Sequence, residues 1–397
     1  MIRVAFLLNF PLTYKGGINY LKNLFYAIST VKRKKVEIYL FVPDGIDQEY
    51  IDAFSPFATI VKTKILTRRD PQWFIDKISE RIFHYNILLN QVLRKYQIDV
   101  ISHSNYVSKN HAFKVLNWIP DFQSMHYPHL WTPKALKNNF SFYHKLIKRS
   151  DLVILSSNSA FDDYKNFSKT NEDKVRVLQF VSQPENDLGP QEMKDMFSSI
   201  KSKYNIENNF FYLPNQFWQH KNHIVVFKAV KILKDRGVDI KLVTSGQMGD
   251  YRVGEEHINM LTNFVSQNKL DENILLLGLI PYREVLVMMQ SCTALINPSL
   301  FEGWSSTVEE AKSIAKTIVL SNIPVHREQS PSKGIFFDPH DAEALADILL
   351  ELWQNLVTSH NSDDLTKSDL YLRTISFANN YHGIIEDAMK LPLKTLR

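Results

Sequence analysis

The sequence predicts an α/β protein built from two Rossmann-like, doubly wound parallel-sheet domains that face each other across a cleft. Three observations support this class. Short apolar runs alternate with amphipathic stretches along most of the chain, which is the pattern of strands and helices around a parallel sheet. A polar segment rich in turn-forming residues, 183–190, separates two similar series of this kind. The length of 397 residues suits two or three domains.

The first series begins with a strand at Val4–Asn9, the pair Gly16-Gly17 and a helix over Ile18–Ser29. Apolar residues at helical spacing over residues 71–96 predict one long helix. A further helix is expected from residue 158 onward. Four other apolar runs have the length of buried strands: Val36–Val42, Val100–Ser102, Val115–Ile119 and Leu152–Ser156.

The second series repeats the rhythm, and a last amphipathic stretch follows it. Strands are expected at Phe210–Pro214, Ile240–Thr244, Ile274–Leu277, Ala294–Asn297 and Ile318–Leu320. Helices are expected at residues 191–204, 222–236, 255–268, 282–291 and 306–316. We therefore expect domains at residues 1–188 and 189–374. Residues 375–397 are expected to form a C-terminal helix that is a candidate to pack back on the N-terminal domain.

Composition excludes several classes of protein. A single cysteine, Cys292, excludes a disulfide framework and any multi-thiolate metal site. No apolar run reaches the roughly 18–20 residues that a membrane span needs. The N-terminal apolar run lacks a small-residue cleavage site and is interpreted as a buried strand. We therefore expect a soluble cytoplasmic protein.

Positive charge is concentrated in the first half of the chain. Residues 1–190 hold 26 Lys and Arg and 17 Asp and Glu, a net charge of +9, whereas the remainder holds 21 and 25, a net charge of −4. The basic clusters are either solvated surface charges or a surface that attracts anionic lipid headgroups or an anionic acceptor. No motif for nucleic-acid readout accompanies them, so nucleic acid is not expected as a partner.

The segment from residue 297 to residue 311 carries the most chemical information. Its strand leads through a tight turn at Gly303 to a helix that begins near Ser305–Thr307, whose first amides favour an anion. Glu302 lies in the loop at the carboxyl end of the strand, where open α/β sheets bind ligands. Glu310 is one turn into the helix. Two such carboxylates are suited to accept hydrogen bonds from vicinal hydroxyls, although each alone is also an ordinary turn or surface residue.

This segment resembles the Glu-x7-Glu motif of the family 4 retaining glycosyltransferases, which have the GT-B fold of two Rossmann-like domains. The resemblance extends in order along most of the chain, through Lys15–Ile18, Trp118–Gln123, Ser156–Ser159, Tyr212–His223 and Ser321–Glu328. It implies a nucleotide-diphosphate sugar as donor and a glycan or lipid-linked saccharide as acceptor. It also implies transfer with retention, no obligatory metal or other cofactor, and a role in bacterial capsule, O-antigen or lipopolysaccharide synthesis at the inner membrane face.

The resemblance assigns roles to individual residues. Lys221 would neutralise the donor diphosphate, Glu302 would bind the transferred sugar and Glu310 the ribose. Gly16 and Gly17 would lie beside the donor phosphates, where the absence of a Cβ permits a close approach. The remaining donor-side candidates are Asn215, Gln216, Gly303, Trp304, Ser305, Ser306, Thr307, Arg327 and Glu328.

The chain departs from the family pattern on the donor side. An arginine usually stands five or six residues before the lysine, and here Asn215 and Gln216 occupy those places. Charge compensation is therefore expected to depend more on Lys221, the helix start and Arg327.

A second departure lies on the acceptor side. The histidine that often follows the strand ending at Ile119 is replaced by Pro120-Asp121. Asp121 is our candidate for that catalytic place, with Gln123, His126 and Tyr127 as acceptor-binding candidates. The same residues are also consistent with a turn and a packed loop.

Two other functions are weighed against transfer. A nucleotide-sugar epimerase of the same fold would need extra acid and base groups, which the sequence does not clearly offer. A non-catalytic scaffold would tolerate the loss of donor residues, yet Glu302, Glu310 and Lys221 are all present.

Overall fold

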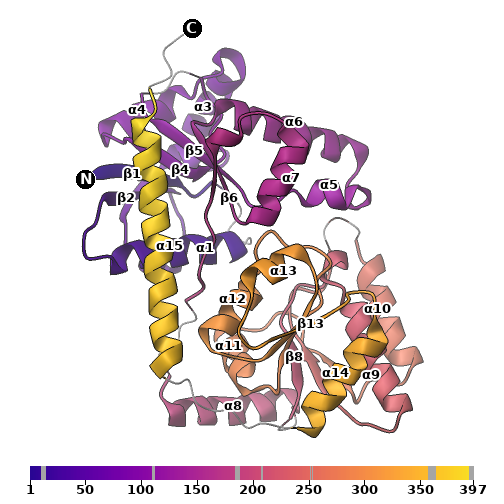
Figure 1. Ribbon diagram of the computed structural model, residues 1–397. Coiled ribbons are helices and arrows are strands. Elements are labelled where there is room, and N and C mark those ends of the chain that lie inside the picture. The colour runs from indigo at the N-terminus through magenta and orange to yellow at the C-terminus, as the bar shows by residue number, and fades with distance from the viewer. Residues whose placement is uncertain are drawn as a thin grey trace. The chain divides into compact units, whose positions relative to one another are not determined.

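The computed structural model describes residues 1–9, 15–109, 112–183, 188–206, 209–250, 252, 254–355 and 364–392. The chain forms two compact units (Figure 1). Unit 1 contains Met1–Val181 and Tyr371–Arg397, and unit 2 contains Ser182–Leu370. The sequence pattern places the two boundaries slightly later, after residues 188 and 374.

Unit 1 contains a seven-stranded parallel sheet in the order β3-β2-β1-β4-β5-β6-β7. The strands are β1 Ile2–Leu7, β2 Val36–Pro43, β3 Thr59–Thr63, β4 Val100–Ser104, β5 Lys114–Ile119, β6 Leu152–Leu155 and β7 Val175–Val177. The α-helices are α1 Lys15–Thr30, α2 Gln48–Phe54, α3 Pro71–Phe83, α4 Ile87–Lys95, α5 Gln123–His126, α6 Pro133–Arg149 and α7 Asn158–Ser168. Short 3-10 turns occur at η1 Lys64–Leu66, η2 Pro128–Leu130 and η3 Glu172–Lys174.

Two expectations for unit 1 were wrong. The single helix expected over residues 71–96 is two helices, because His84 adopts a left-handed conformation (φ 55°) at the end of α3. Asp76 of α3 then accepts hydrogen bonds from the first amides of α4, at Leu88 (3.0 Å) and Leu89 (3.1 Å). Similarly, Gly16 and Gly17 lie in the first turn of α1 and not in a loop that precedes it.

Unit 2 contains a six-stranded parallel sheet in the order β10-β9-β8-β11-β12-β13. The strands are β8 Phe211–Leu213, β9 Leu242–Thr244, β10 Ile274–Leu276, β11 Leu295–Asn297, β12 Ile318–Ser321 and β13 Gly334–Phe337. The helices are α8 Pro190–Tyr204, the 3-10 turn η4 Gln219–Lys221, α9 His223–Asp235, α10 Glu256–Gln267, α11 Tyr282–Ser291, α12 Ser306–Ser313, α13 Pro324–Gln329 and α14 Ala342–Gln354. The strand order reverses between β8 and β11, which makes that pair the topological switch point.

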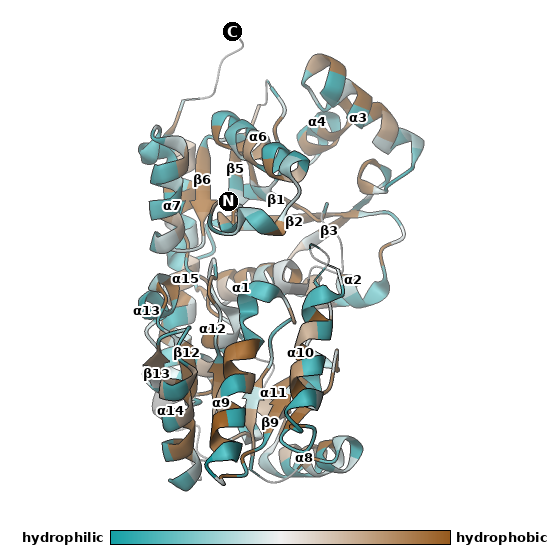
Figure 2. Cartoon of the chain, turned by 90° about the vertical axis from the view of Figure 1, so that its right-hand side faces the viewer, coloured by the Kyte–Doolittle hydropathy of each residue, from teal (hydrophilic) through white to brown (hydrophobic). Residues whose placement is uncertain are grey.

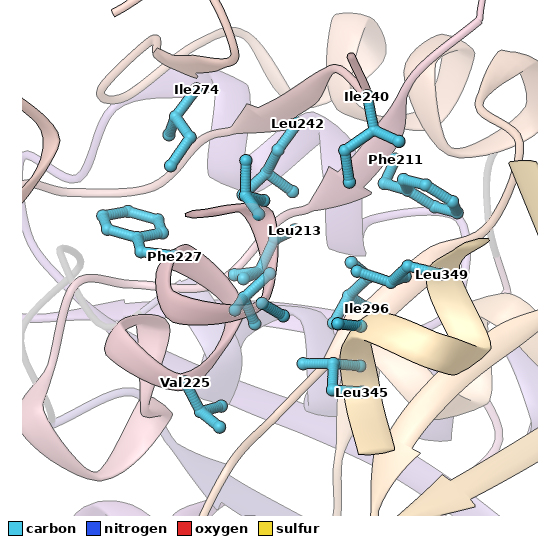
Figure 3. Packing of buried hydrophobic residues seen from close by; sticks show 14 of the residues in the cluster. Phe211, Leu213, Val225, Phe227, Ile240, Leu242, Ile274, Ile296, Leu345 and Leu349 are labelled. Carbon is cyan, nitrogen blue, oxygen red and sulfur yellow. The ribbon is translucent and has the colours of Figure 1, made fainter. Parts of the chain in front are cut away.

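The sheet of unit 2 is buried on both faces. Phe211 and Leu213 of β8 join the cluster formed with α9, α10 and α14, shown in Figure 3, while Tyr212 joins the cluster formed with α8, α11 and α12. Side chains of a strand alternate between faces, so three consecutive apolar residues are needed to fill both sides. Val308 and Ala311 of α12 are fully buried in the second cluster, so this side of the helix packs against the sheet.

The last helix, α15 Asp364–Lys390, begins eleven residues earlier than expected. From Tyr371 onward it belongs to unit 1, where the Tyr381 ring lies 6.2 Å from that of Phe6. The ion pairs Lys35–Glu386 (2.7 Å) and Arg176–Asp387 (3.1 Å) connect it to the residue before β2 and to β7 of the same unit. Within the described residues, no helix is both long and apolar enough to cross a bilayer.

Candidate active site

The strongest group of predicted residues gathers at the switch point of unit 2. Loops that follow β8 and β11 leave the carboxyl edge of the sheet side by side, because the two strands are paired in parallel. Open α/β sheets bind ligands at this place. The loop after β8 leads through η4 to Lys221, and the loop after β11 leads through Glu302 to α12.

A buried amide network joins β8, β11 and α12. The Asn215 side-chain amide donates to Asn297 Oδ1 (3.1 Å), and the Asn297 amide donates to Ser305 Oγ (2.8 Å). Thr307 Oγ1 donates to Asn215 Oδ1 at 3.2 Å. Asn215 therefore holds the start of α12 against the sheet. Asn297 is the junction of the network, and its role has no signal in the sequence beyond its place at a strand end.

Lys221 and Glu302 form an ion pair across the switch point. Lys221 Nζ lies 2.6 Å from Glu302 Oε1, and the side chains are only 14% and 10% exposed. Ser299 Oγ donates to the same carboxylate oxygen at 2.7 Å. Burial alone would raise the pKa of Glu302, but Lys221 and the neighbouring His326 and Ser299 hold that pKa below its usual range. Glu302 is therefore a charged, fixed acceptor beside a cationic donor.

A second buried ion pair supports the η4 turn that carries Lys221. Arg252 and Asp250 are paired at 2.6 Å with side chains 2% and 0% exposed, and the Arg252 guanidinium donates to His220 Nδ1 at 3.2 Å. Burial, followed by the charges of Lys221 and Arg252, lowers the pKa of His220 to about 2. His220 is thus neutral, with its proton on Nε2 because Nδ1 accepts. Sequence reasoning missed Arg252, since thirty residues separate it from the motif.

The start of α12 is arranged differently from the expected serine cap. Ser305 occupies the cap position, but its hydroxyl accepts from Asn297, and its own backbone amide donates to Gln329 Oε1 at 3.2 Å. Gln329 Nε2 returns a hydrogen bond to the Ser305 carbonyl (2.9 Å). Ser306 is exposed and Thr307 is buried at this helix start. Gln329 of α13 was missed because only the fold brings it to α12.

Glu310 and its neighbour Glu309 have different environments. Tyr282 of α11 donates to Glu310 Oε1 at 2.7 Å, and Glu310 is 7% exposed. Burial raises the pKa of Glu310 to about 7, while the Tyr282 hydrogen bond opposes that rise. Glu309 instead pairs with Lys312 at 3.0 Å. Glu310, which was expected to bind the ribose, therefore has different surroundings from Glu309, which pairs with Lys312. Glu302 and Glu310 also have separate partners, Lys221 and Tyr282.

The loop after β9 completes this edge of the sheet. Gly246 has a φ of 147°, and a Cβ at this position would lie 2.4 Å from the Asn215 carbonyl oxygen. Gln216 fixes the same loop, because its Oε1 accepts from the Gln247 amide at 2.9 Å. Asn215 and Gln216, which replace the expected arginine, therefore organise the loops and supply no charge.

The other donor-side candidates are less closely connected with Lys221. Gly303 and Trp304 lie half-buried in the loop between Glu302 and α12. Arg327 is exposed, with its guanidinium bonded to Asn322 and packed 5.6 Å from the Phe336 ring, and Glu328 is half-buried on the same helix α13.

His326, which sequence reasoning left without a role, is fully buried on α13. Its Nδ1 lies 3.0 Å from the Ser321 carbonyl oxygen. Burial lowers its pKa, while the nearby charge of Glu302 opposes that change. The pattern of the sequence gives no signal for this position beyond its place in the quoted motif.

The acceptor-side candidates lie together in unit 1 after β5. Asp121 Oδ1 accepts a hydrogen bond from the Gln123 backbone amide at 2.9 Å, so Asp121 stabilises the turn before α5. Tyr127 is the residue at the end of α5. His126 Nε2 lies 2.7 Å from Asp163 Oδ1 of α7, and this hydrogen bond raises the pKa of His126. Asp163 was not expected from the sequence.

Comparison with known proteins identifies the kind of domain. Residues 196–363 match the family "Glycosyl transferases group 1". The chain is 21% identical over 264 residues to the O-antigen chain mannosyltransferase RfbU of Salmonella typhimurium, an alignment that covers 66% of this chain and 65% of that protein, a little under two thirds of its length.

Solved structures show the same fold. A glycosyltransferase from Rickettsia africae superposes with a TM-score of 0.67 at 15% identity, covering 98% of this chain and 99% of that one. Anabaena Alr3699/HepE in complex with UDP also gives 0.67, at 12% identity and with 98% and 100% covered. The two parallel-sheet units are therefore those of the GT-B fold.

Proposed function

We propose that this chain, which has the GT-B fold and carries a glycosyltransferase group 1 domain, transfers a hexose or related sugar from a nucleotide diphosphate to a saccharide acceptor. The observation that carries the proposal is the buried Lys221–Glu302 pair at the switch point of unit 2, next to the start of α12. This arrangement offers one cation, one helix N-terminus and one fixed carboxylate to a ligand that contains both phosphates and hydroxyls.

The donor would bind by exchanging partners within this pair. Lys221 Nζ moves from Glu302 to the diphosphate, and the start of α12, at Ser306 and Thr307, supplies backbone amides to the same phosphates. Glu302 then accepts hydrogen bonds from the hydroxyls of the sugar, and Glu310 accepts them from the ribose. The Anabaena neighbour was solved with UDP, which supports a nucleotide as the ligand.

Transfer would proceed with retention at the anomeric carbon, as in the family 4 glycosyltransferases that the sequence resembles. The bond between the anomeric carbon and the diphosphate oxygen breaks, and the acceptor oxygen bonds to the same face of the sugar. The acceptor proton passes to the leaving diphosphate. Stabilising the departing negative charge is the main task of the protein, and Lys221 is the residue placed to do it.

We propose that no metal ion is obligatory. Lys221 and the start of α12 together offset part of the diphosphate charge. In other enzymes a bound metal ion performs this task. Transfer activity is therefore expected to persist in the presence of EDTA.

The acceptor would be a glycan or a lipid-linked saccharide in capsule, O-antigen or lipopolysaccharide synthesis. The name of the Salmonella relative, an O-antigen chain mannosyltransferase, supports this setting. Asp121, Gln123, His126 and Tyr127 of unit 1 would contact the acceptor. The net charge of +9 on residues 1–190 supports a cytoplasmic protein that meets anionic lipid at the inner membrane face.

The donor is identified first by thermal shift with UDP, GDP, dTDP and CMP sugars, since a ligand that binds only the folded state raises the melting temperature. Lys221→Ala is expected to abolish the shift and to reduce transfer by about a hundredfold or more. Lys241→Ala is the matched control. The Lys241 side chain is 17% exposed, close to the 14% of Lys221. Lys241 lies just before β9, at the end of the strand opposite to the carboxyl edge that carries the site.

Three results would contradict the proposal. Nucleotide binding without transfer to any glycan would indicate a scaffold. Conversion of the nucleotide sugar without an acceptor would indicate an epimerase. Equal activity of Lys221→Ala and Lys241→Ala would show that the Lys221–Glu302 pair takes no part in transfer.

A further inference from the structure

Helix α3 of unit 1 has its polar side turned inward and its apolar side turned to solvent. Phe74, Ile75, Ile78, Ile82 and Phe83 are 48–63% exposed, whereas Asp76 and Ser79 are buried. Phe74, Ile78 and Ile82 follow one another at intervals of four residues and so form one continuous row. Figure 2 shows apolar and polar residues side by side on this helix. A soluble surface helix normally has the opposite arrangement.

Hydrogen bonds fix α3 in this orientation. Asp76 Oδ1 accepts from the amides of Leu88 and Leu89 at the start of α4, and Asp76 Oδ2 accepts from the Asn86 side chain at 2.8 Å. Ser79 Oγ accepts from the Ile87 amide at 3.2 Å. Rolling α3 to bury its apolar row would break all of these bonds and leave polar groups of α4 without partners. The exposed apolar face is therefore a stable feature of unit 1.

Basic residues border the apolar row. Lys77 and Arg81 form the adjacent row of the helix and are exposed, and Arg68 and Arg69 are exposed just before it. The acidic residues of α3 offset only part of this charge, because Asp76 is buried and Glu80, which is 20% exposed, pairs with Lys77 alone among these four basic residues. The helix thus combines a continuous apolar stripe with a cationic edge.

We propose that α3 is the surface through which unit 1 binds an anionic lipid bilayer. The apolar row would enter the boundary between headgroups and acyl chains, and the four basic side chains would contact the anionic headgroups. This inference deepens the membrane contact of the proposed function and rests on it for its biological meaning. It adds the segment responsible and its orientation, with Asp76 and Ser79 toward the protein.

Charge decides between a bilayer and a second copy of the chain. If two α3 helices packed antiparallel and face to face, the basic edges would be brought together and would repel each other. An anionic bilayer offers acyl chains to the apolar row and negatively charged headgroups to the basic residues beside it, so it complements both parts of the α3 surface.

The test is flotation of the full chain with vesicles of phosphatidylcholine alone or mixed with phosphatidylglycerol in equal parts. The wild type is expected to float with the anionic vesicles and to be released by salt. Ile78→Glu/Ile82→Glu is expected to lower the partition coefficient at least about tenfold, because two apolar side chains no longer enter the bilayer. Lys77→Gln/Arg81→Gln is expected to lower it about tenfold on anionic vesicles only.

The control is Leu372→Glu, whose side chain is 63% exposed on α15 of the same unit, as exposed as that of Ile82. It should float like the wild type. Circular dichroism and thermal unfolding without donor verify that each variant is folded.

Two results would overturn the inference: equal flotation of the wild type and Ile78→Glu/Ile82→Glu, or a dimer without vesicles that this variant abolishes. Failure of the proposed function would look different. Lys221→Ala should float like the wild type whether or not it transfers sugar, and a chain that transfers sugar to a soluble acceptor but does not float would refute the α3 proposal alone.

Discussion

Glu310 illustrates, at the scale of a single residue, how burial changes the chemistry of a site. Its carboxyl group is nearly inaccessible and has a Tyr282 hydroxyl as hydrogen-bond donor. With a pKa raised to about 7 by burial, it changes charge in the range where many enzymes operate. A carboxylate accepts hydrogen bonds from two hydroxyls at once, whereas the protonated form accepts less well. Binding of a ribose there should therefore depend on pH.

The first prediction concerns nucleotide affinity. The affinity of the wild type for its nucleotide is expected to rise as pH increases through about 7, because Glu310 becomes an ionised acceptor. Titration calorimetry from pH 5.5 to 8.5 measures it. Glu310→Gln should bind more weakly and lose this dependence, and a pH profile that survives in Glu310→Gln would refute the assignment.

The second prediction concerns stability at the same residue. The folded pKa of Glu310, about 7, lies above the value of about 4.3 in the unfolded chain, so the folded protein binds the extra proton between these values. The free energy of unfolding should fall by up to about 4 kcal/mol as pH rises through this window. Urea unfolding of the wild type and Glu310→Gln should therefore converge at low pH and separate above pH 7. Parallel curves would show that the group is not buried as described.

The third prediction concerns the pair of Lys221 and Glu302. Lys221→Ala leaves the buried Glu302 carboxylate without its cation and should destabilise unit 2 by about 3–5 kcal/mol. Adding Glu302→Gln removes the unpaired charge and should restore most of that stability without restoring donor binding. Thermal unfolding of the single and double variants measures the coupling, and simple additivity of the two changes would contradict it.

At the scale of elements, the site depends on how closely adjacent strand ends approach one another. The loop after β9 approaches the backbone of the loop after β8 so closely that only glycine fits at position 246. Asn215 lies on the other side of that contact and holds α12 through its side chain. A change in one loop is therefore transmitted to the helix start that we assign to the diphosphate.

The fourth prediction concerns this approach. Gly246→Ala should destabilise unit 2 by more than about 2 kcal/mol and weaken nucleotide binding, because the new Cβ meets the Asn215 backbone. Gly237→Ala is the control, since Gly237 also has a positive φ (79°) but has open space around a Cβ. It should lose only about 1 kcal/mol. Equal losses, measured by thermal unfolding, would mean that backbone strain and not the contact decides the effect.

The elements also show where local patterns mislead. Apolar residues at helical spacing run through residues 71–96, yet the chain turns at His84 and begins a second helix. The turn is favoured by Asp76, which caps α4 from the preceding helix. Spacing along the chain does not reveal such a cap, because the partner lies twelve residues away.

At the scale of the whole molecule, the C-terminal helix completes unit 1. Tyr381 is fully buried, and its ring lies 5.9 Å from that of His103 at the end of β4. The segment from residue 371 onward therefore contributes to the core of a unit whose other residues are the first 181 of the chain.

The fifth prediction follows from this arrangement. Tyr381→Ala should destabilise unit 1 by about 3–5 kcal/mol and increase amide exchange in β1 and β4, while exchange in the unit 2 sheet stays unchanged. Tyr371→Ala, at a position 56% exposed on the same helix, should leave both units as they are. Hydrogen exchange with mass spectrometry distinguishes the two outcomes, and equal loosening of both units would contradict the division.

Much of this fold was predictable from the sequence. Buried strands such as β8 and β11 were found because both faces of a parallel sheet are covered, which requires uninterrupted apolar runs. Lys221, Glu302 and Glu310 were proposed as site residues because their spacing and neighbours resemble a known family. Eight strands and α-helices of the described chain were not predicted, namely β3, β7, β13, α2, α5, α6, α13 and α14, since short or mixed segments give weak periodic signals.

Only the tertiary structure determined which side chains contact one another and which face of a helix is exposed. Asn215 forms part of a buried network, Arg252 supports His220 from 32 residues away, and α3 turns its apolar row outward. The sequence by itself determined the class of fold and the residue types at the strand ends, because these follow from local periodicity. Partnership depends on distances between atoms far apart in the chain, and only the folded structure sets those distances.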